Sequence, residues 1–127
     1  GPGHTGKCLC VDYDVDSPNA AYGGITLNLN RVNAGGCNAL SMRVRGTPSQ
    51  FKVELHGRGG SGATHVRGVK ADEWQTMHIP LMDFGGMITD WGEMHRLVLV
   101  VEDRLADPKT GMLWLDDVEL TVRPARD

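Results

Sequence analysis

Apolar and polar side chains alternate with a period of two along most of this chain. Segments that follow this pattern, or are uniformly apolar, lie at 9–15, 25–29, 40–44, 51–55, 64–69, 73–81, 97–101 and 112–122. Turn-forming sequences such as Ser17-Pro18-Asn19 and Gly46-Thr47-Pro48 separate them. Eight short strands without a helical period predict an all-β fold, a two-sheet antiparallel β-sandwich.

Three segments depart from simple alternation. The run at 97–101 is continuously apolar, which predicts a central strand buried on both sides. The run at 57–62 is rich in glycine, but no helix follows it, so we expect a flexible hairpin loop rather than a phosphate cradle. Residues 82–93 are expected to form a connection that contains one short helical turn.

The composition limits the classes of protein and of partner. A chain of 127 residues fits one domain, and a formal net charge of -3 argues against nucleic acid as a partner. No apolar run reaches the ~20 residues of a membrane span, and no signal peptide is visible. Residues 1–3 look like a tag remnant, so we expect 4–127 to be a single sandwich domain cut from a larger protein.

The spacing of the three cysteines argues against a zinc or redox centre. Cys8 and Cys10 stand two apart on a predicted strand, which is unfavourable for a bridge between them. Either could instead pair with Cys37, but the simpler interpretation is three reduced thiols. No Cys-x-x-Cys spacing occurs.

Acidic residues stand out in the first and last predicted strands. Asp12, Asp14 and Asp16 fail the pattern of an EF-hand, so they are read as the solvent face of a strand, with a shared cation as the alternative. Asp116 and Asp117 interrupt the closing strand, and aspartate is a poor strand former. This pair therefore makes specific hydrogen bonds, binds a cation or turns a local corner.

No motif predicts an enzyme. Glu54 and Glu102 could form a carboxylate pair, but nothing in the sequence selects them as acid and base. His56 and His65 could approach each other across the glycine-rich segment, although solvated or hydrogen-bonded roles are the simpler interpretation. Among the aromatic residues, Tyr22 and Trp91 lie in predicted loops and are the freest to meet a ligand. Trp114 has outward parity, which predicts a covering loop or partner.

The order of the segments resembles a known family. The sequence Trp74-Gln75-Thr76-Met77-His78-Ile79-Pro80-Leu81-Met82-Asp83-Phe84 and the later Leu115-Asp116-Asp117-Val118 are typical of galactose-binding-like jelly rolls. Over about residues 8–122 the chain resembles family 11-type carbohydrate-binding modules and the related domain of the complex I assembly factor CIA30. The resemblance implies a polysaccharide or oligosaccharide as the partner, and an extracellular, cell-surface or periplasmic location.

The resemblance also implies particular sites. A structural Ca²⁺ in such modules uses carboxylates of the closing strand, which here are Asp116 and Asp117. Sugar binds the outer, concave face of the sheet formed by 24–30, 51–57, 64–69 and 96–102. The outward side chains there would hold hydroxyls, or an acidic sugar through Arg67, with help from Tyr22 or Trp91. They are Thr26, Asn28, Glu54, His56, His65, Arg67 and Glu102, with Arg104 at the rim.

The main prediction is therefore a non-catalytic carbohydrate-binding module. The alternative is a protein-interaction or assembly module on the same fold, in which Arg43, Arg45 and the aspartate row contact another protein domain. A lyase or hydrolase that uses Glu54 or His56 is a more distant third interpretation.

Overall fold

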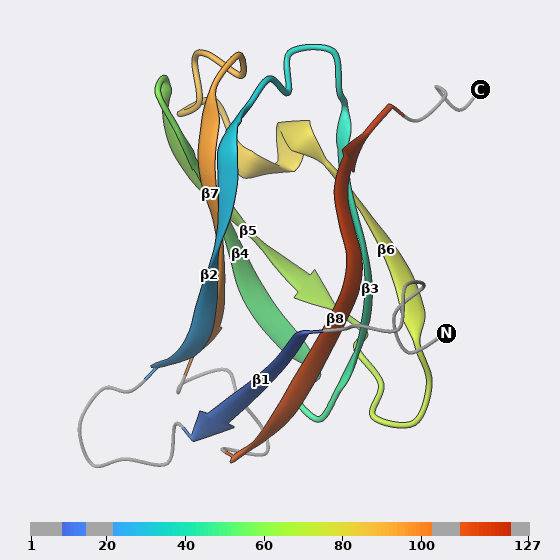
Figure 1. Cartoon of the computed structure of the whole chain (residues 1–127). Helices are drawn as coiled ribbons and strands as arrows, with labels where there is room; N and C mark the ends of the chain where they lie inside the picture. The colour runs from blue at the N-terminus through green and yellow to red at the C-terminus, as the bar shows by residue number, and fades with distance from the viewer. Residues whose placement is uncertain (1–8, 15–21, 103–109, 123–127) are drawn as a thin grey trace.

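Two antiparallel sheets of four strands face each other in this computed structural model (Figure 1). It describes residues 9–14, 22–102 and 110–122. The strand order is β1-β8-β3-β6 in the first sheet and β2-β7-β4-β5 in the second. The first sheet comprises β1 (Leu9–Asp14), β8 (Thr110–Thr121), β3 (Ala39–Gly46) and β6 (Gln75–Pro80). The second comprises β2 (Tyr22–Val32), β7 (Met94–Glu102), β4 (Gln50–Gly57) and β5 (Gly60–Arg67). The predicted all-β sandwich is confirmed.

The core lies between the sheets and is built by the period-two pattern. Phe51, Val53 and Leu55 of β4 are at most 1% exposed, while the residues between them reach the outer face. The single-turn helix η1 (Leu81–Phe84) lies between the two layers at the upper end in Figure 1. It confirms the short helical turn predicted in this connection. Leu81 and Phe84 are its buried residues and join the same core.

The central position of β7 is confirmed, but its burial on both sides is not. β7 pairs with β2 on one edge and β4 on the other. Leu97, Leu99 and Val101 are buried in the core, whereas Val98 and Val100 are only half-buried. Uniform hydrophobicity here therefore reflects a core on one face and an apolar floor on the other.

The glycine-rich segment forms the predicted hairpin, and Gly57 pairs with Gly60 across its two-residue turn. β4 ends at Gly57 and β5 begins at Gly60, four residues before the strand that the alternation predicted. A Cβ at Gly62 would stand 2.1 Å from the carbonyl oxygen of Phe84, and one at Gly60 would stand 2.2 Å from that of Met87. The glycines are thus required because the backbone of 84–90 lies directly against β5.

A β-bulge explains the two aspartates of the closing strand. Between the pairs Ser41↔Glu119 and Arg43↔Asp116, β8 contains one residue more than β3. Asp117 has a φ of 51°, and its backbone N–H donates to Oδ1 of Asp116 at 2.9 Å. Of the three interpretations of the pair, the hydrogen bond and the local corner are both present.

Neither of the described cysteines, Cys10 and Cys37, forms a disulfide with another described residue. Cys8 and the expected tag remnant at 1–3 lie outside the described residues. No helix in the described ranges is long and apolar enough to cross a membrane.

Candidate functional site

The outer face of the β2-β7-β4-β5 sheet brings together most of the predicted ligand-binding side chains. These four strands are those in which the resemblance placed the binding face. Glu54 pairs with Val98, which pairs with Thr26, so that the three form one row across the sheet. His56, Arg96 and Asn28 form the next row. We call this surface the β4 face.

A hollow of about 450 Å³ lies at the centre of the β4 face. Val98 and Val100 line it from β7, and Thr26 lines it from β2. Lys52 and Glu54 of β4 add charged groups to the same hollow. An apolar floor edged by a few polar groups is the usual composition of a small-molecule site.

Glu54 is held by two neighbours on its own strand. Its Oε1 lies 2.8 Å from Nε2 of His56, and its Oε2 lies 3.1 Å from Nζ of Lys52. The hydrogen bond from His56, aided by Lys52, lowers the pKa of Glu54 below its ordinary value. An ionised carboxylate at neutral pH is a good hydrogen-bond acceptor for hydroxyl groups but a poor general acid.

A second histidine–carboxylate pair crosses the sheet. Nε2 of His65 on β5 lies 2.9 Å from Oε1 of Glu102 on β7. The hydrogen-bonded role that was the simpler interpretation of His56 and His65 is thus confirmed, with a carboxylate as the partner of each. A third such pair joins His95 to Glu93 at 2.9 Å, and this hydrogen bond lowers the pKa of Glu93.

The remaining predicted residues are placed differently. Asn28 is exposed, and its Oδ1 accepts the backbone N–H of Asn30 at 2.7 Å, which leaves its amide N–H groups for a ligand. Arg67 is exposed on β5. Tyr22 is paired through its backbone with Glu102, but its side chain is not among those described. Arg104 lies outside the described residues.

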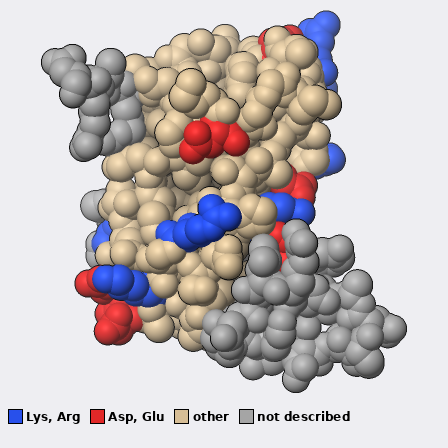
Figure 2. Space-filling model, turned by 180° about the vertical axis from the view of Figure 1, so that it is seen from behind, with Lys and Arg blue, Asp and Glu red and all other residues tan. Residues whose placement is uncertain are grey.

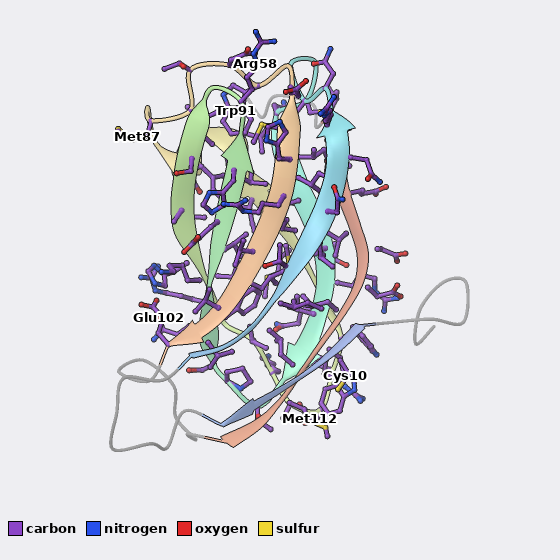
Figure 3. The ribbon with its side chains drawn as sticks, turned by 60° about the vertical axis from the view of Figure 1, so that its left-hand side comes forward. Cys10, Arg58, Met87, Trp91, Glu102 and Met112 are labelled. Atoms are coloured by element: carbon purple, nitrogen blue, oxygen red, sulfur yellow. The ribbon has the colours of Figure 1, made fainter. Side chains whose placement is uncertain are left out.

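Trp91 belongs to a different hollow at one end of the sandwich. This hollow, of about 600 Å³, is lined by Trp91 together with Cys37, Leu81, Met82 and Asp90, among others. In Figure 3, Trp91 and Arg58 lie at one end of the sheet and Glu102 lies at the other. The structure therefore does not bring Trp91 to the central hollow of the β4 face. The described side chains that line this central hollow include no Phe, Tyr or Trp.

Sequence reasoning missed Lys52, Arg96 and the two valines. Lys52 shares its parity with Glu54 and His56, so the period-two pattern alone contained the signal. Val98 and Val100 were hidden because a continuous apolar run was read as buried on both sides. Arg96 stands just before that run and is exposed.

The outer face of the other sheet carries a stack of arginine and tryptophan. The guanidinium of Arg45 lies 4.8 Å from the ring centroid of Trp114 and 5.6 Å from that of Trp74. Arg43 lies 5.3 Å from the ring centroid of Trp74. These distances fit cation–π contacts, so Trp114 is covered by an arginine of the neighbouring strand. We call this surface the Trp114 face.

The described residues alone do not fit a calcium site. Oδ1 of Asp116 already accepts the N–H of Asp117, and Asp116 is 8% exposed. No group of three or more His, Cys, Asp or Glu side chains within the described ranges could hold a metal ion. Hard cations such as Ca²⁺ need six to eight oxygen ligands. The predicted Ca²⁺ at Asp116 and Asp117 stays a prediction.

Charged side chains are scattered over the side of the molecule shown in Figure 2, and Lys and Arg do not gather there into one patch. A nucleic-acid site would instead favour a continuous basic surface.

Solved structures share this fold. An exo-β-agarase matches with a TM-score of 0.77 and 11% identity over 100% of this chain and 22% of the agarase. The family 11 carbohydrate-binding module of the cellulosomal cellulase Lic26A-Cel5E of Clostridium thermocellum matches with a TM-score of 0.65 and 11% identity, over 94% of this chain and 84% of the module. A family 11 module from the same organism, in complex with a β-1,3-1,4-mixed-linked tetrasaccharide, matches with a TM-score of 0.69 and 14% identity. This match covers 99% of this chain and 82% of the module.

At these identities the comparisons establish the fold, which is the sandwich of family 11 carbohydrate-binding modules. The chain spans most of the length of these modules but only about a fifth of the agarase. No family model and no curated protein matches the chain. The link to the CIA30 domain stays a prediction.

Proposed function

We propose that this domain is a non-catalytic carbohydrate-binding module that holds a polysaccharide or oligosaccharide on the β4 face. One observation carries the proposal: hydrogen-bonding side chains from β2 and β4 line a hollow of about 450 Å³ whose floor is apolar. The valine floor packs against the C–H groups of a sugar ring, and the surrounding polar groups bind its hydroxyls. Binding of this kind is reversible and needs no covalent step.

The residues to which we assign the binding role are Thr26, Asn28, Lys52, Glu54, His56, His65, Arg67 and Glu102. Glu54 is oriented by His56 and Lys52, and Glu102 is oriented by His65, so both carboxylates are held in place before a ligand arrives. Because these side chains are already fixed, less conformational entropy is lost when a ligand binds. An extracellular, cell-surface or periplasmic location fits such a role.

Affinity electrophoresis in gels that contain a polysaccharide tests the proposal. The probes are barley mixed-linked β-glucan, agarose, κ-carrageenan and alginate. We expect at least one polymer to retard the domain, and Glu54→Gln to reduce that retardation. Glu73→Gln is the matched control, because Glu73 is an exposed carboxylate that is paired with Lys70 on the loop after β5. Unchanged mobility in every polymer would reject carbohydrate binding.

A protein-interaction module is the second candidate. Trp74 and Trp114 are only half-buried, and Met112, also on β8, is 38% exposed. Exposed apolar groups of this kind mark protein contacts when they form a patch. Arg43 and Arg45, which we predicted to contact a partner, lie against Trp74 and Trp114. Of the aspartate row, the side chains of Asp12 and Asp14 are not described, and Asp16 lies outside the described residues. Loss of partner capture on Trp114→Ala, with polysaccharide retention absent, would favour this candidate.

A further inference from the structure

Two arginines on the β4 face have no partner in the described part of the chain. Arg67 ends β5 and Arg96 stands near the start of β7, and both side chains are exposed. The central hollow lies between them along the strands, because Arg96 precedes Val98 and Arg67 follows His65, the partner of Lys52. No ion pair or hydrogen bond with a described group engages either guanidinium.

The carboxylates of the same face, in contrast, are already engaged. Glu54 contacts Lys52 and His56, and Glu102 contacts His65. The described side chains of this face thus include three Lys or Arg residues and two glutamates, although the whole chain has a formal net charge of -3. A ligand that approaches the hollow therefore meets unpaired positive groups at both ends.

The spacing of the two arginines selects an extended ligand. Arg96 is level with His56, and Arg67 is level with Gln50, six residues further along β4. At about 3.3 Å per residue, the two positions are roughly 20 Å apart along the sheet. A single small anion cannot bridge this distance, whereas a polymer that carries repeated anionic groups can.

We propose that the polysaccharide bound by the β4 face is anionic, with carboxylate or sulfate groups that Arg67 and Arg96 bind at either end of the hollow. This inference rests on the function proposed above and names the chemical class of its ligand. Arginine presents paired N–H donors that match the oxygens of a carboxylate or sulfate. Because both guanidiniums are exposed, the attraction is screened by salt.

The test compares charged and neutral polymers in the same affinity gels. Agarose and barley β-glucan are the neutral probes, κ-carrageenan carries sulfate and alginate carries carboxylate. We expect κ-carrageenan or alginate to bind at least about tenfold more tightly than either neutral polymer at 50 mM NaCl. Raising NaCl to 500 mM should weaken that binding several-fold. Whichever charged polymer binds more tightly identifies the anionic group.

Single substitutions distinguish binding by Arg67 and Arg96 from non-specific electrostatic attraction. Arg67→Gln and Arg96→Gln should each weaken binding to the charged polymer about fivefold, whereas Lys70→Gln, with the same change in charge, should change it less than twofold. Equal effects of all three variants, or equal binding of neutral and charged polymers, would overturn the proposal that the ligand is anionic. The proposal of carbohydrate binding would still stand. Absence of binding to all four polymers would overturn both.

Discussion

The two outer faces of the sandwich use arginine in opposite ways. On the Trp114 face, the guanidinium of Arg45 lies 4.8 Å from one tryptophan ring and 5.6 Å from another, so the planar groups cover each other. On the β4 face, Arg67 is exposed beside a hollow with an apolar floor. A stacked arginine contributes to the stability of the fold, and an exposed one is available to a ligand.

This difference predicts that stability and binding separate by face. Substitutions on the Trp114 face should lower the free energy of unfolding and leave polysaccharide binding unchanged. Substitutions of the polar residues on the β4 face should weaken binding. They should change the stability little, because the side chains that are replaced lie outside the core. The following predictions run from the largest expected effect to the smallest.

Trp114→Ala should lower the free energy of unfolding by about 2–3 kcal/mol, because it removes a half-buried ring and the cation–π partner of Arg45. Urea denaturation monitored by circular dichroism measures this change. Retention by the polysaccharide that binds the wild type should stay the same. A loss of retention as large as that of Glu54→Gln would contradict the separation of the two faces.

Asp117→Val should lower the free energy of unfolding by about 1–2 kcal/mol, because a β-branched residue is strained at the φ of 51° that the bulge requires. Asp117→Asn is the matched control, since asparagine accepts this conformation readily. The same urea experiment compares the two variants. Equal stability of both would show that the bulge does not depend on this backbone conformation.

Glu54→Gln should weaken polysaccharide binding about tenfold, which corresponds to ~1.4 kcal/mol. The change removes a charged acceptor that His56 and Lys52 orient toward the hollow. Isothermal titration with the polymer identified by the gels gives the dissociation constant. Glu73→Gln, which removes the same charge from an exposed loop, should bind as the wild type does. Unchanged binding by Glu54→Gln would remove Glu54 from the site.

The same substitution should have a small effect on stability that depends on pH. The hydrogen bond from His56 lowers the pKa of Glu54 in the folded protein, so the ionised carboxylate stabilises the fold at pH values above its ordinary pKa near 4.5. This contribution is lost as the pH falls from 4.5 through the lowered pKa. Thermal unfolding at pH 7 and pH 3 should show that the difference between wild type and Glu54→Gln shrinks at pH 3. A difference that grows there would contradict the assigned direction.

Much of the β4 face could be predicted from the sequence because alternation decides which side chains leave the core. Glu54 and His56 follow directly from their buried neighbours Phe51, Val53 and Leu55. The membership of the sheet came from the resemblance, since alternation does not say which strands are paired. The same limit hid the stack of Arg45 and Trp114, which depends on the pairing of β3 with β8.

Other features could not be predicted because they depend on close approach between distant segments. The glycines at 60 and 62 look like a flexible loop until the backbone of 84–90 is seen against them. Trp91 was grouped with the binding face because it is aromatic and lies in a loop, but the packing of that loop places it in another hollow. The bulge at Asp117 likewise follows from the register between two strands.

Nuclear magnetic resonance mapping tests the central claim most directly. The ¹⁵N-labelled domain is titrated with oligosaccharides prepared from the polymer that retards it most strongly. The largest shifts are expected in the amide signals around the central hollow, at Thr26, Glu54 and Val98, while those near Arg45 and Trp114 stay unchanged. Shifts centred on the Trp114 face, with the β4 face unaffected, would contradict the assignment of the sugar to this sheet.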